Sequence, residues 1–460
     1  MKLLASTHFK ISERKMLLRV FDVIFVWFSL YIASQNLNFT YFNLNANINF
    51  LIWLVTLGIY ILVFGTVFEI YDLQKAESKK TIFKNLTLTT LLVTLLFLLT
   101  PVLSPSLPEN RFQIFYFFII VLSTLMIWRL FYIFLISSPH FFKRVILVGN
   151  QFDVDFIGNI LLNNNLNYEI KGFVSLKEYQ SSKFKFYRVE NLQKVVKDND
   201  INEIVVVSSY EDLNSKLCRA LDPLLNSGFP INTYAHLYEY ATHKVPIQGV
   251  EKEIYFYYTF NQNYQHRLYQ LYRRIVDIMA SVVGLAMGII ILPLIVIGNL
   301  IANRGCLFYK QVRLGKHGNK FRILKFRTMI SNAERNGPQL ARKKDKRVTA
   351  FGKFLRHTRL DEIPQFYNVL VGNMSLIGPR PERPEFIERL SKKIPFYEVR
   401  QVVMPGLTGW AQVNTRYANS EEDLIEKLQY DLYYIKHRSV FLDFRIIVKT
   451  ISTVIFYRGQ

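Results

Sequence analysis

The chain of 460 residues is 50% hydrophobic and 15% aromatic, and its formal net charge is +22 at pH 7. This apolar content disfavours an ordinary soluble protein, while the charge calls for an anionic partner such as nucleic acid, a lipid surface or phosphorylated substrates. Two cysteines, Cys218 and Cys306, exclude a disulfide framework and do not have the spacing of metal ligands.

Four apolar stretches precede residue 140, beginning at Leu17, Phe50, Leu86 and Phe112. Each is close to the roughly 20 residues that a helix needs to cross the hydrocarbon core of a bilayer. Buried helices of a soluble protein are the alternative, but four such stretches in succession favour membrane spans. The residues before them lack the apolar core and cleavage site of a signal peptide. We therefore predict a four-helix transmembrane domain over residues 1–140.

The charges between these stretches predict their orientation. The linker over residues 34–49, SQNLNFTYFNLNANIN, carries no charge. Basic residues instead lie before the first stretch, between the second and third, and after the fourth: Lys2, Lys10, Arg14, Lys15, Lys75, Lys79, Lys80, Lys84, Lys143 and Arg144. Because basic loops stay on the cytoplasmic side, both ends of this domain are expected to face the cytoplasm.

Residues 141–262 are typical of a Rossmann-like α/β domain. RVILVGN from Arg144 and INEIVVVSS from Ile201 have the pattern of buried strands, and LQKVVKDND from Leu192 that of a helix between them. Strand, helix and strand in this order indicate a parallel sheet. The segment VGNQFDVDFIG lacks G-x-G-x-x-G, so we favour a regulatory or scaffolding role over dinucleotide binding.

A fifth apolar segment, Arg273 to Gly305, opens a domain predicted over residues 263–460. It is long enough to span a bilayer, yet both flanks are basic, with Arg267, Arg273 and Arg274 before it and Lys310, Arg313, Lys316 and Lys320 after it. Pro293 removes a helix hydrogen bond within it. We favour a re-entrant helix over about residues 271–303 that bends near Pro293 and returns to the same face, with a true span as the alternative.

Two adjacent carboxylates, Asp361 and Glu362, stand out in the basic segment that follows. Neighbouring side chains on a helix point about 100° apart, so the two acids can divide labour. One can hold a divalent cation while the other attacks a phosphorus made electrophilic by that cation. Mg²⁺ suits this, because it takes carboxylate oxygens together with substrate phosphate oxygens. The alternative is a solvated acidic pair near a helix start.

Arginine between prolines, in Pro379-Arg380-Pro381, predicts a phosphate ligand on a stiffened backbone. Lys325, Arg327 and Arg356 could complete a pocket for a diphosphate, or such cations could contact only anionic lipid headgroups. Gly406 and Gly409 in PGLTGW are expected to permit turns or close backbone approach. The C-terminal DFRIIVKTISTVIFYR has helical apolar spacing and is expected to lie at the membrane interface.

The last 190 residues resemble the bacterial sugar transferase domain of polyprenyl-phosphate phosphoglycosyl transferases, in their long form with an added bundle and Rossmann-like domain. The resemblance is carried by RRIVDI, Pro293, KFRTM, LDEIPQ, NVLVGNMSLIGPRP, PGLTGWAQVN and YDLYYIKHRSVFLDFRI. It implies a mixed α/β membrane protein: a four-helix transmembrane bundle, a Rossmann-like middle domain, and a monotopic phosphoglycosyl transferase domain with a re-entrant membrane helix and interfacial helices.

The resemblance also implies a reaction that starts exopolysaccharide, capsule or O-antigen synthesis. Asp361 would attack the β-phosphorus of a UDP-sugar, with UDP-glucose or UDP-galactose favoured, and release UMP; undecaprenyl phosphate would then take the sugar phosphate. Glu362 matches the Mg²⁺ ligand. Positions implicated in site organisation or substrate binding fall on Lys325, Arg356, Arg380 and Asp443, and a sugar-nucleotide contact on Arg416.

The expected setting is the bacterial inner membrane, with several passes and the catalytic domain on the cytoplasmic face. Expected partners are the UDP-sugar, undecaprenyl phosphate and anionic lipids of the inner leaflet, with homo-oligomerisation left open. A non-catalytic membrane assembly or regulatory factor of polysaccharide export is the competing hypothesis. A nucleic-acid binder, which the charge alone would allow, is disfavoured because no groove-reading motif is present.

Overall fold

The computed structural model describes residues 11–36, 39, 41, 50–71, 79–101, 103–108, 110–136, 143–149, 154, 158–159, 162, 168–175, 183–207, 215–247, 267–303, 305–330, 333, 345, 347–415 and 420–455. It divides into two compact units, Met1–Tyr234 and Ala235–Gln460. Each unit is described by itself.

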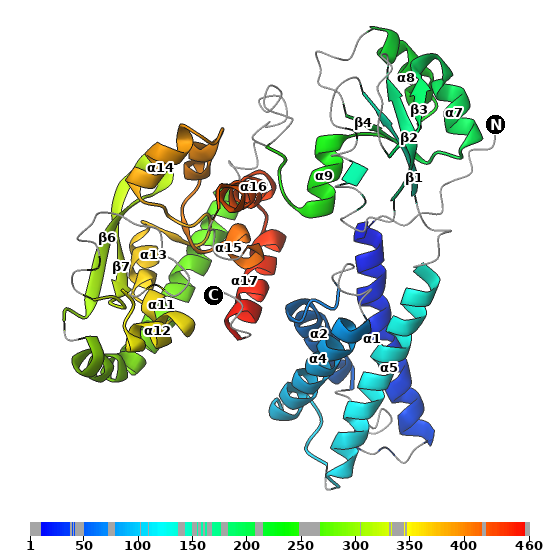
Figure 1. Ribbon diagram of the computed structural model, residues 1–460. Coiled ribbons are helices and arrows are strands. Elements are labelled where there is room, and N and C mark those ends of the chain that lie inside the picture. Colours follow the sequence, from blue (N-terminus) through cyan, green and yellow to red (C-terminus); the bar gives the residue numbers. More distant parts are fainter. Residues whose placement is uncertain are drawn as a thin grey trace. The chain divides into compact units, whose positions relative to one another are not determined.

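The first unit begins with four long apolar helices (Figure 1): α1 (Ile11–Asn36), α2 (Phe50–Val67), α4 (Lys79–Leu99) and α5 (Phe112–Ile136). Helix α1 packs on α2 and α5, and α4 packs on α2 and α5. All four are long and apolar enough to cross a membrane, as is one helix of the second unit. The chain is therefore a membrane protein, and the expected starts of the four stretches fall within these helices.

One buried ion pair joins the first and last of these helices. Arg129 Nη2 on α5 lies 2.6 Å from Asp22 Oδ2 on α1, and both side chains are fully buried. Charges inside an apolar bundle are costly unless they are paired. This pair therefore fixes the contact between α1 and α5 instead of exposing either charge to lipid.

A five-stranded parallel sheet follows in the first unit, in the order β3-β2-β1-β4-β5. Its strands are β1 (Lys143–Val148), β2 (Tyr168–Ser175), β3 (Phe186–Arg188), β4 (Glu203–Val206) and β5 (Ile231–Thr233), with helices α7 (Leu192–Asp198) and α8 (Ser215–Asn226). Apolar residues of β1, β2, β4, α7 and α8 form one core. The strand, helix and strand predicted from sequence here are confirmed, and the domain is α/β.

The second unit is a mixed α/β assembly. A hairpin of β6 (Phe308–Leu314) and β7 (Lys320–Phe326) is antiparallel, and two short strands, β8 (Ser375–Ile377) and β9 (Gly406–Thr408), pair in parallel. Around them lie α9 (Tyr234–Thr242), α12 (Ala350–His357), α13 (Gln365–Val371), α14 (Pro384–Ser391), α15 (Trp410–Asn414), α16 (Glu421–His437) and α17 (Val440–Ile455), with short helical turns η7 (Leu360–Glu362) and η8 (Tyr397–Val402).

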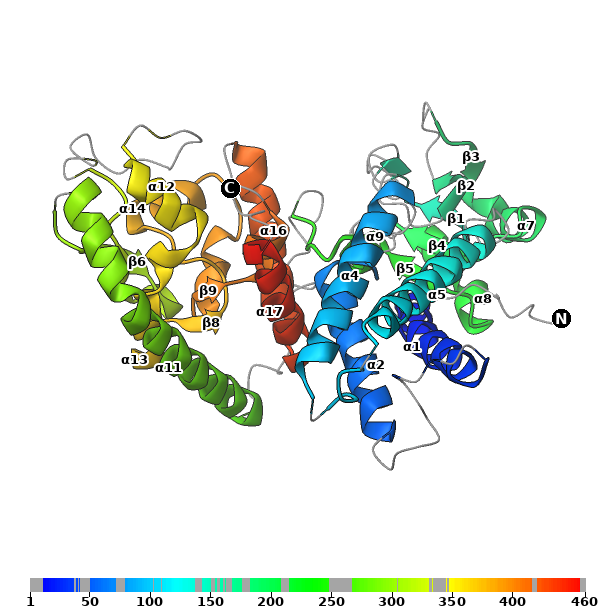
Figure 2. The same cartoon turned by 90° about the horizontal axis from the view of Figure 1, so that it is seen from below.

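Helix α11 (Arg267–Gly298) runs along one edge of the second unit, beside α12, α13 and β8 (Figure 2). The helix extends across Pro293, where the expected bend stays a prediction, and passes into the π-helical turn η5 (Asn299–Asn303). Glycines on one side permit close packing, because a Cβ at Gly284 would lie 2.4 Å from Phe366 and one at Gly298 2.2 Å from Phe351. The opposite side is apolar and exposed.

Residues from α9 to Ile247 pack on α15 and α16. Glu239 on α9 bonds Lys436 Nζ at 3.0 Å, and Trp410 Nε1 donates to the carbonyl of His243 at 3.1 Å. Val245 and Ile247 enter a core that includes Leu428 and Leu432 of α16. This connector thus belongs to the compact second unit.

Candidate functional site

The pocket around Asp361 and Glu362 has a volume of about 350 Å³ and a strongly basic lining. Nine cationic side chains of the described residues line it. Eight come from three segments, residues 313–327, 347–359 and 380–383, and the ninth from α16: Arg313, Lys325, Arg327, Arg347, Arg356, Arg359, Arg380, Arg383 and Lys427. Such a concave basic site suits a substrate with several phosphate oxygens.

A tight turn presents the two carboxylates. Arg359, two residues beyond the end of α12, adopts a left-handed backbone (φ 60°), and the 3₁₀ turn η7 carries Asp361 and Glu362. Thr349 caps the start of α12 by accepting from the Gly352 N–H at 2.9 Å. Both carboxylates are buried, so the turn holds them in the pocket wall and not in open solvent.

Glu362 forms ion pairs with three cations. Its Oε1 accepts from Lys325 Nζ at 2.9 Å and from Arg380 Nη2 at 2.7 Å, while Oε2 lies 3.7 Å from Arg359 Nη1. Burial alone would raise the pKa of Glu362, but the charges of Arg380, Lys325 and Arg359 outweigh it and hold that pKa well below its usual range. Glu362 is therefore a fixed anion across the physiological pH range.

The pKa of Asp361 is shifted in the opposite direction. Burial, and next the negative charge of Glu362, raise the pKa of Asp361 to about 6, although Lys325, Arg356 and Arg380 act to lower it. No hydrogen bond to its carboxylate is formed by any residue in the described part of the chain. A buried carboxylate that is ionised at neutral pH and not engaged by hydrogen bonds is a competent nucleophile.

Arg380 is positioned through its backbone neighbours. The Gly406 N–H donates to the carbonyl of Pro379 at 2.8 Å, and Arg313 Nη1 donates to that of Pro381 at 3.0 Å. The approach of β9 to this loop is so close that a Cβ at Gly406 would lie 2.0 Å from the Gly378 nitrogen. The expectation of close backbone approach at Gly406 and Gly409 is confirmed, and it serves the loop that carries Arg380.

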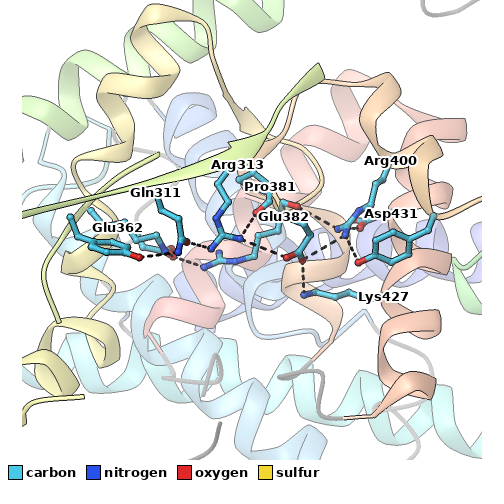
Figure 3. A network of polar contacts seen from close by, with 12 residues as sticks. Gln311, Arg313, Glu362, Pro381, Glu382, Arg400, Lys427 and Asp431 are labelled. Carbon is cyan, nitrogen blue, oxygen red and sulfur yellow. Dashed lines mark hydrogen bonds and ion pairs between the residues drawn. The ribbon is translucent and has the colours of Figure 1, made fainter. Parts of the chain in front are cut away.

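A buried charge network extends from this loop to α16 (Figure 3). Glu382 lies 3.7 Å from Arg313 Nη1, 3.6 Å from Arg400 Nη1 and 3.9 Å from Lys427 Nζ. Arg400 also donates to Asp431 Oδ2 at 2.6 Å. Burial would raise the pKa of Glu382, yet Lys427, Arg400 and Arg313 lower it. Glu382 therefore remains charged and engages three cations, of which Arg313 and Lys427 line the pocket with it.

Two further predicted cations also line the pocket. Arg356 on α12 donates from Nε to Thr328 Oγ1 at 2.9 Å. Two hydrogen bonds fix the backbone of Arg327: its N–H donates to the Leu307 carbonyl, and its own carbonyl accepts from Asn303 Nδ2. The predicted residues Lys325, Arg327, Arg356, Arg380, Asp361 and Glu362 are thus brought together.

Asp443 and Arg416 are not part of this group. Asp443 is buried on α17, where it accepts from Tyr269 at 2.7 Å and Tyr434 at 3.0 Å, and it does not line the pocket. It joins α17 and α16 to the start of α11. Arg416 lies outside the described residues.

Sequence reasoning missed Glu382 and Lys427, which line the pocket, and the Arg400–Asp431 ion pair that contacts Glu382. Two of these residues carried a signal in the sequence. Glu382 directly follows Pro381, and Asp431 interrupts the apolar face of LQYDLYYI, where a buried carboxylate requires a partner. Nothing in the sequence pairs Asp431 with Arg400 across 31 positions.

The carboxylate oxygens of Asp361 and Glu362 are of the hard type that Mg²⁺ prefers. Within the described residues no group of three or more acidic, histidine or cysteine side chains could hold a metal by itself. The donor set therefore fits a Mg²⁺ ion that takes one protein carboxylate and completes its shell with substrate phosphate oxygens.

Comparison with known proteins gives one family. A model of that family, described as bacterial sugar transferase, matches residues 268–457. UDP-N-acetylgalactosamine-undecaprenyl-phosphate N-acetylgalactosaminephosphotransferase of Aeromonas hydrophila is 43% identical over 188 residues, which are 41% of this chain and 44% of that protein. UDP-glucose:undecaprenyl-phosphate glucose-1-phosphate transferase of Xanthomonas campestris is 42% identical over 164 residues, 35% of this chain and 34% of that protein.

A protein of the latter name from Caulobacter vibrioides is 35% identical over 189 residues, which are 40% of this chain and 70% of that relative. The chain thus covers less than half of the length of the first two relatives and more than two thirds of the third. The family match lies in the second compact unit.

Proposed function

The chain belongs to the bacterial sugar transferase family, and from this premise we propose that it transfers a sugar 1-phosphate from a UDP-sugar to undecaprenyl phosphate. One observation carries the proposal: Asp361 lies in a basic pocket beside a second carboxylate that Lys325 and Arg380 engage. In this arrangement Asp361 is the reactive carboxylate, and Glu362 is the carboxylate that is ion-paired.

In the first half-reaction, a carboxylate oxygen of Asp361 attacks the phosphorus that carries the sugar. An O–P bond forms to Asp361, and the bond from that phosphorus to the bridging oxygen breaks, so UMP leaves with the electron pair. Charge grows on the departing phosphate oxygens, where Arg356, Arg380 and Lys325 would stabilise it. Because Asp361 attacks as an anion, no proton needs to be removed at neutral pH.

In the second half-reaction, a phosphate oxygen of undecaprenyl phosphate attacks the same phosphorus. The bond to Asp361 breaks and regenerates the carboxylate, while the new P–O bond creates a lipid-linked diphosphosugar. Both substrates carry anionic phosphate groups, which accounts for the basic lining of the pocket.

We further propose that Glu362 holds Mg²⁺ together with substrate phosphate oxygens. When bound, the ion would neutralise phosphate charge and make the phosphorus more electrophilic. Lys325 and Arg380, which engage Glu362 in this structure, would turn to the substrate phosphates. A Mg²⁺ titration of the Glu362→Gln variant should need more Mg²⁺ for half-maximal rate; an unchanged requirement would remove Glu362 as the ligand.

The proposed setting is the cytoplasmic face of the bacterial inner membrane, with α11 as a re-entrant element. Contacts to the globular part of the second unit occur along the whole helix: Arg274 donates to the Val369 carbonyl near one end, and Asn303 to the Arg327 carbonyl beyond the other. A helix that crossed the bilayer would leave the domain at one end. Because α11 contacts the globular part at both of its ends, we propose that both ends lie on the same side of the membrane.

The donor sugar is proposed to be UDP-glucose or UDP-galactose, as favoured from the sequence. The names of the relatives divide between glucose and N-acetylgalactosamine. A panel of UDP-sugars offered with undecaprenyl phosphate would decide between them, and turnover of N-acetylated donors alone would overturn the preference.

The reaction is tested by UMP release from UDP-sugars in purified membranes. The Asp361→Asn variant should lose at least about three orders of magnitude in rate, because the covalent step has no nucleophile. A matched control is Glu388→Gln, which removes an exposed carboxylate on α14 and should keep the wild-type rate. UMP release at the wild-type rate by Asp361→Asn would refute the nucleophile, and no release by the wild type would favour the non-catalytic assembly factor.

A further inference from the structure

A second cavity of about 620 Å³ lies apart from the Asp361 pocket and shares none of its lining residues. Five segments converge on it: the first turns of α11, the β6–β7 turn, the end of α13 with the start of β8, residues 402–404, and the start of the α16–α17 connection. The proposed reaction uses none of these residues.

The lining of this cavity is basic. Arg273, Arg274, Lys316 and Arg438 line it with one carboxylate, Asp277, and a second carboxylate outside the lining, Asp443, lies 3.9 Å from Arg273 Nε. Asp277 accepts from the Leu376 N–H at 2.8 Å and from Ser375 at 3.1 Å. Arg274 donates to two carbonyls, of Val369 and Leu370, which carry no formal charge to offset its own. The cavity therefore keeps a net positive charge.

Exposed apolar side chains border the same cavity. Val371 on α13 is 55% exposed and Val402 is 36% exposed, and both belong to the lining. On α11, which is apolar enough to lie in a membrane, the exposed residues beside the lining arginines are Leu268, Leu271, Tyr272 and Ile275. A basic hollow within an apolar, membrane-directed surface suits a ligand with an anionic head and a hydrocarbon tail.

We propose that this cavity binds the headgroup of an anionic phospholipid of the bilayer. Lys316 from the hairpin turn and Arg438 from the end of α16 contact the headgroup phosphate from opposite segments. The acyl chains leave the cavity along Val371, Val402 and the exposed face of α11. A bound lipid would tie the hairpin to the start of α11 at the membrane surface.

The test uses the full chain in a non-ionic detergent, with retained lipid measured by native mass spectrometry after addition of phosphatidylglycerol or phosphatidylcholine. The wild type should retain phosphatidylglycerol and not phosphatidylcholine. The Lys316→Gln variant should bind phosphatidylglycerol about fivefold more weakly, and Lys316→Gln with Arg438→Gln about 25-fold, from the usual contribution of a basic residue near anionic lipid.

The matched control is Lys310→Gln with Lys320→Gln. It removes the same charge from the same hairpin at exposed positions outside the lining, and should bind within twofold of wild type. Equal retention of both lipids, equal losses in control and test variants, or unchanged binding by Lys316→Gln in a protein of wild-type melting temperature would overturn the proposal.

Two competition arms identify the occupant. Inorganic phosphate in excess should leave the lipid bound, and displacement by it would show a site for free anions. Undecaprenyl phosphate should not displace phosphatidylglycerol one for one, and such displacement would assign the cavity to the acceptor. Neither UDP-sugar nor turnover enters these measurements, so their outcome is separate from that of the proposed reaction.

Discussion

Asp361 and Glu362 are neighbours in one turn, yet their surroundings shift their pKa values in opposite directions. Glu362 is paired with two cations at 2.7 and 2.9 Å, whereas burial, and next the negative charge of Glu362, disfavour ionisation of Asp361. Division of two carboxylates into a permanent anion and a titrating group assigns their roles in many active sites. Here it makes Asp361 the proposed nucleophile.

The pH dependence of the proposed reaction follows from Asp361. The attacking form is the carboxylate, and burial, followed by the charge of Glu362, raises its pKa to about 6. The kcat/KM of UMP release should therefore be low below pH 5, rise through about pH 6 and level off above pH 7. Arg356 acts to lower this pKa, so Arg356→Gln should move the rise to higher pH.

A control for that shift lies on the same helix. Lys353 on α12 is exposed and does not line the pocket, so Lys353→Gln should keep the wild-type profile. The pH midpoint of the kcat/KM profile reports a pKa of the free enzyme. Weaker substrate binding by Arg356→Gln would therefore not by itself move this midpoint. A rise at lower pH in Arg356→Gln would contradict the electrostatic assignment.

At the scale of elements, the pairing of β8 with β9 holds the loop that carries Arg380. Gly406→Ala would place a methyl group 2.0 Å from the Gly378 nitrogen. We expect a loss of about 1–3 kcal/mol in the free energy of unfolding from overpacking. We also expect at least about a tenfold loss of UMP release, because Arg380 is displaced from the phosphates. Denaturant titration and the UMP assay measure the two effects.

Gly228→Ala separates loss of stability from loss of activity. Gly228 has φ 72° with no atom within 4 Å of an added Cβ, and lies in the other unit. An alanine there should destabilise by about 1 kcal/mol through backbone strain alone. Its UMP release at a temperature where the protein is folded should match the wild type. If Gly406→Ala also kept full activity, the clamp on Arg380 would have no catalytic importance.

Most helices and strands could be predicted from the sequence, because apolar runs and strand patterns depend on residues that are close together in the chain. The helices α2 and α5 begin at Phe50 and Phe112, where their apolar stretches begin. The interior of α11 was harder to predict. The bend near Pro293 stays a prediction: α11 extends across this residue to Gly298, and Gly284, Gly288 and Gly298 lie close to bulky neighbours.

At the scale of the whole molecule, the sequence allowed the cations of the site to be grouped, but it did not predict the charge network around Glu382. Lys325, Arg356 and Arg380 lie in motifs that suggest phosphate binding, and the fold brings them to one pocket. Arg400 and Asp431 meet only through packing of η8 on α16. The connector over residues 239–247 packs on α16, and this packing could not be predicted either. It depends on contacts such as Glu239 with Lys436, which are almost 200 positions apart.

Membrane topology gives a prediction for the whole chain. With Cys218 and Cys306 replaced by serine, a cysteine at exposed Lys320 should react with an impermeant thiol reagent only after cells are permeabilised. The control is Asn45→Cys, in the uncharged linker expected outside, which should react in intact cells. Labelling of Lys320→Cys in intact cells would make α11 a true span and place the pocket outside the cytoplasm.

The covalent intermediate is the most direct test of all. The purified chain is mixed with a UDP-sugar and Mg²⁺ without any lipid acceptor, quenched, digested and analysed by mass spectrometry. We expect the peptide containing Asp361 to gain the mass of one sugar phosphate, and to lose it when undecaprenyl phosphate is added. Complete conversion of both substrates with no such mass on that peptide at any time point would contradict a covalent route through Asp361.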